Sequence, residues 1–194
     1  MPGIRAFIAI DLPADVRQKL NAVEQQLQAS CGEAARRVVR WVPADKIHLT
    51  LKFLGDVASD MLPPLADLLQ REAARHPGFE LVIGGLGVFP NPRRPRVIWV
   101  GCDGGAGLGS LQKALDQATQ RLGYPGEDRP FSPHLTLGRV SEGAREEELS
   151  ALVRALQESK IGELGRASVT RIHLFRSDLR PGGPVYTSLH QFPL

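Results

Sequence analysis

The sequence is poor in cysteine, in long apolar runs and in net charge, and each shortage excludes a class of protein. Two cysteines, Cys31 and Cys102, lie far apart without C-x-x-C spacing, which argues against a disulfide framework and a cysteine-built zinc site. The first apolar run, residues 4–10, contains Arg5 and ends at Asp11, so it is too short for a signal-peptide core or a membrane span. We therefore expect a cytoplasmic protein that is neither exported nor inserted into a membrane.

The net charge is too small to identify a partner. The chain carries 24 Lys and Arg against 21 Asp and Glu, a formal charge of +3, which does not by itself indicate nucleic-acid binding. Most of the basic residues are arginine, whose planar fork suits phosphate, but a biased genome composition also explains them. Hydrophobic content of 42% and charged content of 23% are those of a folded globular protein.

Hydrophobic periodicity predicts a mixture of strands and helices. Strands are expected at residues 4–10, 38–42, 47–54, 79–89, 96–101, 134–140, 167–175 and 184–190, and helices after residue 13 to about 28 and at 61–75, 108–122 and 145–158. Hairpins alternate with helices in this order, which favours an α+β fold over a doubly wound parallel sheet. We expect two sheet-and-helix lobes in one domain spanning residues 1–194, because no stretch is long enough to be a linker.

One short internal repeat stands out from this background. His48-Leu49-Thr50-Leu51 recurs as His134-Leu135-Thr136-Leu137. With 5 His, 5 Thr and 26 Leu in the chain, chance supplies roughly 0.002 copies of this tetrapeptide. In a strand the His and Thr share one face and the two leucines the other. A single copy would be read as a half-buried strand with a polar outer face, but two copies make that interpretation weak.

The repeated residue types suit chemistry on a phosphodiester. Two imidazoles that face each other across a cleft can act as general base and general acid near neutral pH. Threonine hydroxyls beside them can donate hydrogen bonds to the non-bridging oxygens of an anion. The symmetry of the two motifs leaves the roles of base and acid interchangeable.

The sequence resembles the 2H phosphoesterases, which are named for two His-x-Thr-x motifs, and among them the RNA 2',3'-cyclic phosphodiesterases, also called 2'-5' RNA ligases. The likeness extends beyond the motifs to residues 5–10, 48–55, 85–101, 131–139 and 177–186. It implies two pseudo-symmetric α+β lobes around a central cleft. It also implies that His48 and His134 are the catalytic pair and that Thr50, Thr136 and Arg139 bind the substrate phosphate.

Arg139 raises a conflict between the resemblance and the geometry of a strand. It follows His134 by five residues, which in a regular strand places it on the opposite face. It reaches the site only if the chain bends or bulges at Gly138. The first motif continues with Lys52 and Phe53 instead, so the repeat is asymmetric after its fourth residue.

Other residues are weaker candidates. Arg93 and Arg94 in a predicted hairpin turn are candidates to guide RNA, although a basic turn is more often only solvated. Phe7 and Phe53 are candidates to stack on a base, although apolar strand residues belong to the core by default. The glycine-rich residues 104–109 fail the G-x-G-x-x-G test and are expected to form a loop leading into a helix.

The resemblance implies that the protein hydrolyses a terminal 2',3'-cyclic phosphate on RNA to a 2'-phosphate, without a metal or other cofactor. The expected partners are RNA ends or nucleotides that carry this group, with no membrane or obligate protein partner, and the protein is expected to be a monomer. Attack by a 5'-hydroxyl in place of water would give a 2'-5' linkage by transesterification. Two alternatives stay open: a non-catalytic RNA-binding module of the same fold, and a zinc hydrolase, which needs about three protein ligands.

Overall fold

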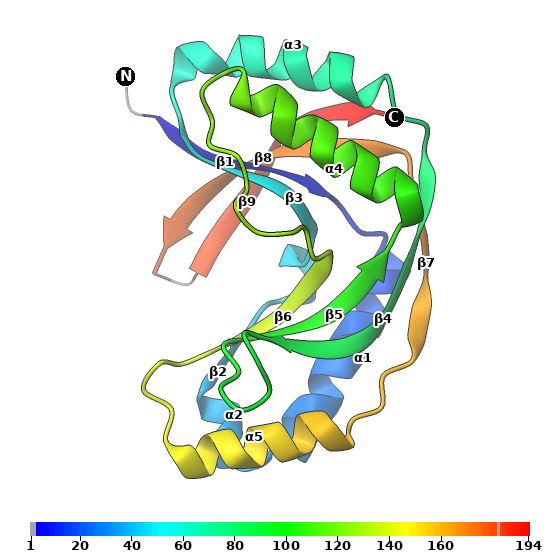
Figure 1. Ribbon diagram of the computed structural model, residues 1–194. Helices are drawn as coiled ribbons and strands as arrows, with labels where there is room; N and C mark the ends of the chain where they lie inside the picture. The colour runs from blue at the N-terminus through cyan, green and yellow to red at the C-terminus, as the bar shows by residue number, and fades with distance from the viewer. Residues whose placement is uncertain (1–2, 182) are drawn as a thin grey trace.

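Nine strands, counted over residues 3–181 and 183–194, the part of the chain that this computed structural model describes, form one continuous antiparallel sheet (Figure 1). Along the sheet the order is β7-β4-β5-β6-β3-β1-β8-β9, and β2 pairs with β6. The strands are β1 (Ile4–Ile10), β2 (Val39–Trp41), β3 (Leu49–Val57), β4 (Phe79–Phe89), β5 (Val97–Asp103), β6 (His134–Val140), β7 (Glu163–Val169), β8 (Arg171–Arg180) and β9 (Gly183–Pro193). The helices are α1 (Ala14–Ser30), α2 (Gly32–Arg37), α3 (Leu62–Ala73), α4 (Gly105–Gln120) and α5 (Glu146–Glu158), with 3-10 turns at Ala44–Lys46 and Ser59–Met61.

The strand order is symmetric about the centre of the sheet. β6 is followed outward by β5, β4 and β7, and β3 is followed outward by β1, β8 and β9. The two central strands pair at Leu49 and Leu135, the second residue of each His-Leu-Thr-Leu repeat. A pseudo-two-fold axis therefore passes between these leucines, and the expected α+β fold with two pseudo-symmetric lobes is confirmed.

The helices are exchanged between the two halves of the sheet. α1 follows β1 in sequence, but it packs against α5 and against β7 at the far end of the sheet. α4 follows β5 and packs against α3 and β3. In Figure 1, α3 and α4 lie together at one end of the molecule, and α1, α2 and α5 gather at the other. Because each half is covered by a helix from the other, pulling the halves apart would expose apolar surface to water.

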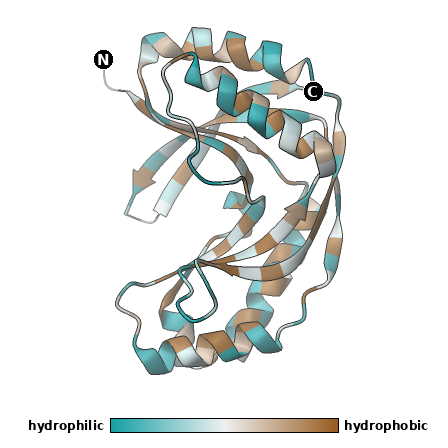
Figure 2. Cartoon of the chain, in the orientation of Figure 1, coloured by the Kyte–Doolittle hydropathy of each residue, from teal (hydrophilic) through white to brown (hydrophobic). Residues whose placement is uncertain are grey.

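The core lies between the sheet and these helices. Ile8 of β1, Leu49 and Leu51 of β3, and Leu20 and Leu27 of α1 are all buried. Each fully buried leucine stabilises the fold by about 1.5–3 kcal/mol. Figure 2 shows hydrophilic and hydrophobic residues side by side along the helices, as expected for helices with one face on the core. None of the helices in the described residues combines the length and the apolar character needed to span a membrane.

The strand expected at residues 167–175 is wrong, because the chain changes partners within it. β7 ends at Val169 and pairs with β4, whereas β8 begins at Arg171 and pairs with β1. Thr170 therefore marks the crossing from one half of the sheet to the other. Apolar residues alternate with polar ones on both sides of Thr170, and the adjacent polar residues Thr170 and Arg171 shift the phase of that alternation where the partner changes.

Two further expectations about glycines are wrong. The strand expected to end before Gly55 continues to Val57. Gly55 does not end it, because the positive φ of +72° is accommodated next to a bulge opposite Ala6 and Phe7. The loop expected at residues 104–109 is largely the first turn of α4, and Asp103 accepts a hydrogen bond from the Gly105 backbone N–H at 2.8 Å. The short helix α2 also has no counterpart among the expected elements.

Candidate functional site

The two repeats meet in one cleft of about 630 Å³ at the centre of the sheet. His48, Thr50, His134 and Thr136 all line it. The register explains why, because residues on either side of a paired residue in an antiparallel ladder also face each other. With Leu49 paired to Leu135, His48 is level with Thr136 and Thr50 is level with His134. The leucines point into the core, and the four polar side chains share the cleft face.

Both histidines are anchored in the same way. His48 Nδ1 lies 2.9 Å from the carbonyl oxygen of Lys46, and His134 Nδ1 lies 2.7 Å from the carbonyl oxygen of Ser132. A carbonyl oxygen only accepts hydrogen bonds, so Nδ1 carries the proton in both rings. Nε2 is therefore the nitrogen left to exchange a proton in the cleft. In each repeat the carbonyl belongs to the residue two positions before the histidine.

Aromatic side chains hold the His48 ring in place. Phe7 stacks on it with ring centroids 4.7 Å apart, and Tyr186 meets it edge-on at 5.0 Å. Burial lowers the pKa of His48, although the Lys46 carbonyl and the charge of Asp11 act in the opposite direction. The ring is therefore held in its neutral form near neutral pH. On the other side of the cleft, Phe89 meets the His134 ring edge-on at 5.0 Å.

A β-bulge brings Arg139 to the cleft. Opposite Ile98 and Trp99 of β5, strand β6 carries one extra residue, Leu137, between Thr136 and Gly138. The extra residue reverses the alternation of faces, so Arg139 lies on the same face as His134 and lines the cleft. The condition set for Arg139, a bend or bulge at Gly138, is thus met by a bulge one residue earlier in the chain. Gly138 is also needed, because a Cβ there would lie 2.8 Å from Val39 Cγ1 on β2.

The first repeat has the same bulge with different residues after it. Ile8 and Ala9 of β1 pair with Lys52 and Thr50, which leaves Leu51 as the extra residue. Phe53 consequently occupies the place that Arg139 has in the second repeat, where it lines the cleft and is 60% exposed. Lys52 occupies the place of Gly138 and is buried on the other face.

Positive charge dominates the lining of the cleft. The described residues that line it include five cations and no Asp or Glu, and the cations are Arg5, Arg40, Lys46, Arg139 and Arg180. Arg40 of β2 lies directly opposite Arg139 of β6, and like charges in that position repel each other. Burial raises the pKa of Tyr186, and the charges of Arg139, Arg40 and Arg5 oppose that rise. The cleft is therefore built to receive an anion.

Sequence reasoning missed four of these five cations. They lie on β1, β2, β8 and the turn before β3, so no local pattern joins them. Arg5 and Arg180 do lie within runs that resemble the family, and that is the one signal that could have found them.

The structure places one of the weaker candidates, Phe7, at the cleft and two others, Arg93 and Arg94, outside it. Phe7 lines the cleft but is only 3% exposed and packs on His48, Phe53 and Phe175, so it offers little surface to a base. Arg93 and Arg94 lie exposed in the turn between β4 and β5 and do not belong to the cleft lining, so their contact with RNA stays a prediction. Among the described residues, no group of three or more His, Cys, Asp or Glu is placed to hold a metal ion.

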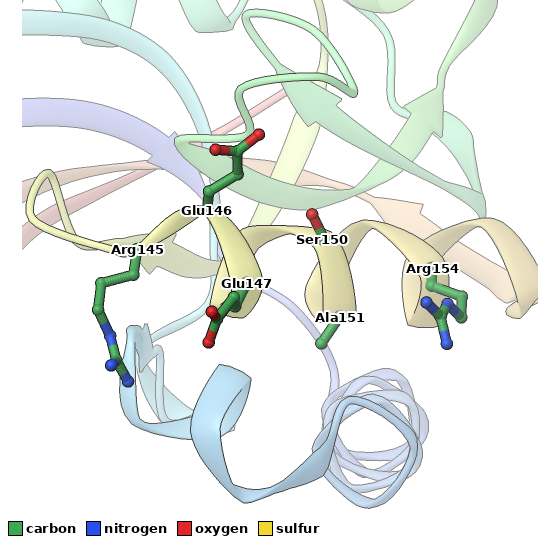
Figure 3. A pocket seen from close by; sticks show the side chains of 6 residues that line it. All are labelled: Arg145, Glu146, Glu147, Ser150, Ala151 and Arg154. Carbon is green, nitrogen blue, oxygen red and sulfur yellow. The ribbon is translucent and has the colours of Figure 1, made fainter.

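A second hollow, of about 520 Å³, lies on α5 at the surface (Figure 3). Its side chains point in different directions, and Arg145 is already paired with Glu148 at 2.9 Å. It therefore offers no convergent set of groups comparable with the central cleft.

A sequence profile described as LigT-like phosphoesterase matches the chain twice, at residues 10–99 and at residues 100–186. The chain belongs to the LigT-like phosphoesterase family. Each match contains one His-Leu-Thr-Leu repeat, so the family's own unit is duplicated here in agreement with the two-fold sheet. The resemblance drawn from the sequence is confirmed.

Alignments with relatives of this LigT-like protein extend over nearly the whole chain. An RNA 2',3'-cyclic phosphodiesterase of Methanothermobacter thermautotrophicus is 34% identical over 191 residues, which is 98% of this chain and 99% of that protein. The crystal structure of TT0787 of Thermus thermophilus has a TM-score of 0.81 at 31% identity, covering 98% of this chain and 97% of that one. Escherichia coli LigT complexed with 3'-AMP has a TM-score of 0.76 at 32% identity, covering 99% and 98%. The LigT-like fold expected from the sequence is confirmed.

Proposed function

We propose that this protein hydrolyses a terminal 2',3'-cyclic phosphate on RNA and leaves a 2'-phosphate. The observation that carries the proposal is the pair of repeats, which bring two identically anchored imidazoles and two threonines to one cation-lined cleft. Two histidines at one reacting centre supply both a general base and a general acid. The name of the M. thermautotrophicus relative supports the choice of substrate.

In this proposal His48 is the base and His134 is the acid. Burial lowers the pKa of His48 and keeps its Nε2 free to accept a proton. Nε2 takes that proton from a water molecule as the water oxygen bonds to phosphorus. The bond from phosphorus to the 3'-oxygen breaks, and Nε2–H of His134 donates a proton to the leaving oxygen. The product carries a 2'-phosphate and a 3'-hydroxyl, and each proton-transfer role contributes typically about 10²- to 10⁴-fold in rate.

The remaining cleft residues hold the phosphate. The hydroxyls of Thr50 and Thr136 donate hydrogen bonds to its non-bridging oxygens, and the Arg139 guanidinium contributes charge and a fork of two donors. Arg40 opposes Arg139 across the β2–β6 ladder, and a phosphate between the two guanidinium groups would relieve their repulsion. These contacts strengthen as negative charge builds up on the oxygens in the transition state.

The same groups would support ligation. If a 5'-hydroxyl takes the place of water, His48 takes its proton as the 5'-oxygen bonds to phosphorus, the bond from phosphorus to the 3'-oxygen breaks, and His134 protonates the 3'-oxygen, which gives a 2'-5' linkage. Ligation is then a secondary activity of the hydrolytic site.

The test is product analysis on an RNA that ends in a 2',3'-cyclic phosphate, incubated with the purified protein in excess EDTA. We expect conversion to an RNA with a 2'-phosphate, which is separated by chromatography from the 3'-phosphate isomer. A 3'-phosphate product would contradict the assigned leaving group, and activity that needs Zn²⁺ or Mn²⁺ would favour a metal hydrolase. Binding of this RNA without turnover would instead support a non-catalytic RNA-binding module.

A further inference from the structure

A buried lysine lies directly behind the first repeat. Lys52 of β3 is 1% exposed, although it follows Thr50 by only two residues. The bulge at Leu51 turns it away from the cleft and towards α4, where its Nζ lies 2.5 Å from Asp116 Oδ1. A buried ammonium group needs partners for its charge and its three donors. The groups that Lys52 Nζ contacts are therefore the ones that it holds in place.

The partners of Lys52 join three parts of the molecule. Its Nζ also donates to the carbonyl oxygen of Pro125 and lies 3.9 Å from Glu127 Oε1. Asp116 Oδ1 accepts the Glu127 backbone N–H at 3.2 Å, and Asp116 Oδ2 accepts Gln120 Nε2–H at 2.8 Å. Strand β3, helix α4 and the segment after α4 are therefore tied together through one lysine.

That segment leads to the second catalytic motif. Residues 124–133 form neither a helix nor a strand and run directly into His134. Near the start of the segment, the Tyr124 backbone N–H donates to the Thr119 carbonyl at 3.2 Å. At its end, the Pro133 carbonyl accepts the Cys102 N–H at 3.2 Å. Between these two points the segment is held to the body of the protein by Lys52 and Asp116.

The symmetry of the fold does not require this lysine. The equivalent position in the second repeat is Gly138, where strand β2 leaves no room for a side chain. Packing alone would accept an apolar residue at position 52, because a buried ion pair is often replaced by apolar residues without loss of stability. A lysine at position 52 is needed only if Pro125 and Glu127, which it contacts, have to be held in place.

We infer that Lys52 is a positioning residue for His134, acting from behind the first repeat on the segment that carries the second. It fixes Pro125 and Glu127, and thereby the path of the chain to Ser132, whose carbonyl orients the His134 ring. The first motif thus sets the geometry of the second histidine as well as its own. The effect of this positioning on turnover rests on the proposed function.

The test separates positioning from stability with three variants. Lys52→Met leaves Asp116 without its cation, so both the melting temperature and kcat should fall. Lys52→Met combined with Asp116→Leu removes both charges, so the melting temperature should recover while kcat stays about tenfold or more below wild type and KM changes by less than about threefold. Lys113→Met, an exposed lysine on the same helix α4, is the matched control and should behave as wild type.

Nuclear magnetic resonance of the histidine ring protons gives a readout that does not depend on turnover. In the double variant we expect the His134 ring resonance to shift or broaden while that of His48 stays in place. Recovery of both melting temperature and kcat, with an unchanged His134 resonance, would overturn the inference. If wild-type protein shows no activity on an RNA that ends in a 2',3'-cyclic phosphate, the proposed function fails, but the resonances still decide the role of Lys52.

A milder variant covers the case in which Lys52 variants do not fold. Asp116 is 17% exposed on α4, so Asp116→Asn should fold while weakening the hold on Lys52 and on the Glu127 N–H. We expect a lower kcat at unchanged KM and a perturbed His134 resonance. Wild-type values for both would contradict the positioning role.

Discussion

Substitution of Arg139 tests the bulge and the proposed phosphate contact together. None of the hydrogen bonds or ion pairs found among the described residues uses its guanidinium, and its neighbour across the β2–β6 ladder is another cation, Arg40. Without substrate, Arg139→Ala therefore removes a repulsion and leaves no partner unsatisfied. A cross-strand pair is worth roughly 0.2–1 kcal/mol. At about 2–4 °C per kcal/mol for a chain of this size, the melting temperature should stay the same or rise by up to about 4 °C.

Activity should move in the opposite direction. A charge-assisted hydrogen bond contributes about 1.5–3 kcal/mol, so Arg139→Ala should lower kcat/KM by about 10- to 100-fold. Arg139→Lys should also be impaired, because a point charge does not reproduce the two-donor fork. The assay is steady-state hydrolysis of a nucleoside 2',3'-cyclic phosphate beside thermal melts, with exposed Arg154→Ala of α5 as the control. Wild-type kinetics for both Arg139 variants, or a loss of activity that follows a fall in melting temperature, would refute the reasoning.

Three further predictions concern the rest of the cleft. His48→Ala and His134→Ala should each lower kcat by about 100-fold or more in folded protein, and near-normal turnover in either would exclude two-histidine catalysis. Burial lowers the pKa of His48, with the charge of Asp11 opposing and that of Arg17 assisting, so the His48 ring takes up its second proton only at a pH below its ordinary pKa of about 6.5. The acidic limb of a kcat/KM profile should then lie below that pH, and a limb above it would reassign the base. Phe53→Ala should raise KM by about 5-fold or more with little change in kcat if Phe53 stacks on a base, whereas unchanged KM would remove it from the binding site.

The central part of the site was predictable because its signal is local. His48, Thr50, His134 and Thr136 are read from a repeated tetrapeptide, and strand alternation alone places each His and Thr on one face. Strand β6 was expected with its observed bounds because its apolar and polar residues alternate from His134 onward. These features depend on neighbours in sequence, where the pattern carries the information.

Features that depend on distant partners were not predictable in the same way. The bulge at Leu137 is a mismatch between β6 and β5, and a single strand's sequence contains only half of that relation. Arg40 reaches the cleft because β2 pairs with β6. The crossing at Thr170 depends on the pairing of β7 with β4 and of β8 with β1. The anchoring of His48 and His134 by backbone carbonyls was also missed, since a carbonyl is present at every residue and leaves no mark in the sequence.

The two repeats have the same four residues and differ from the fifth residue onward, where the two sides of a substrate would call for different side chains. A two-fold arrangement suits acid–base chemistry, because one proton is taken and one is given at the same phosphorus atom. A nucleotide end is not symmetric, since a charged phosphate lies on one side and a flat base on the other. The same bulge in each strand projects the sixth residue of the motif into the cleft, and there the first repeat has Phe53 and the second has Arg139. The fifth residues differ as well, with Lys52 holding the loop behind the first repeat and Gly138 admitting β2 behind the second. In the proposed mechanism, duplication supplies the two histidines that act as base and acid, and the divergence directly after the repeat supplies one side for the phosphate and one side for the base.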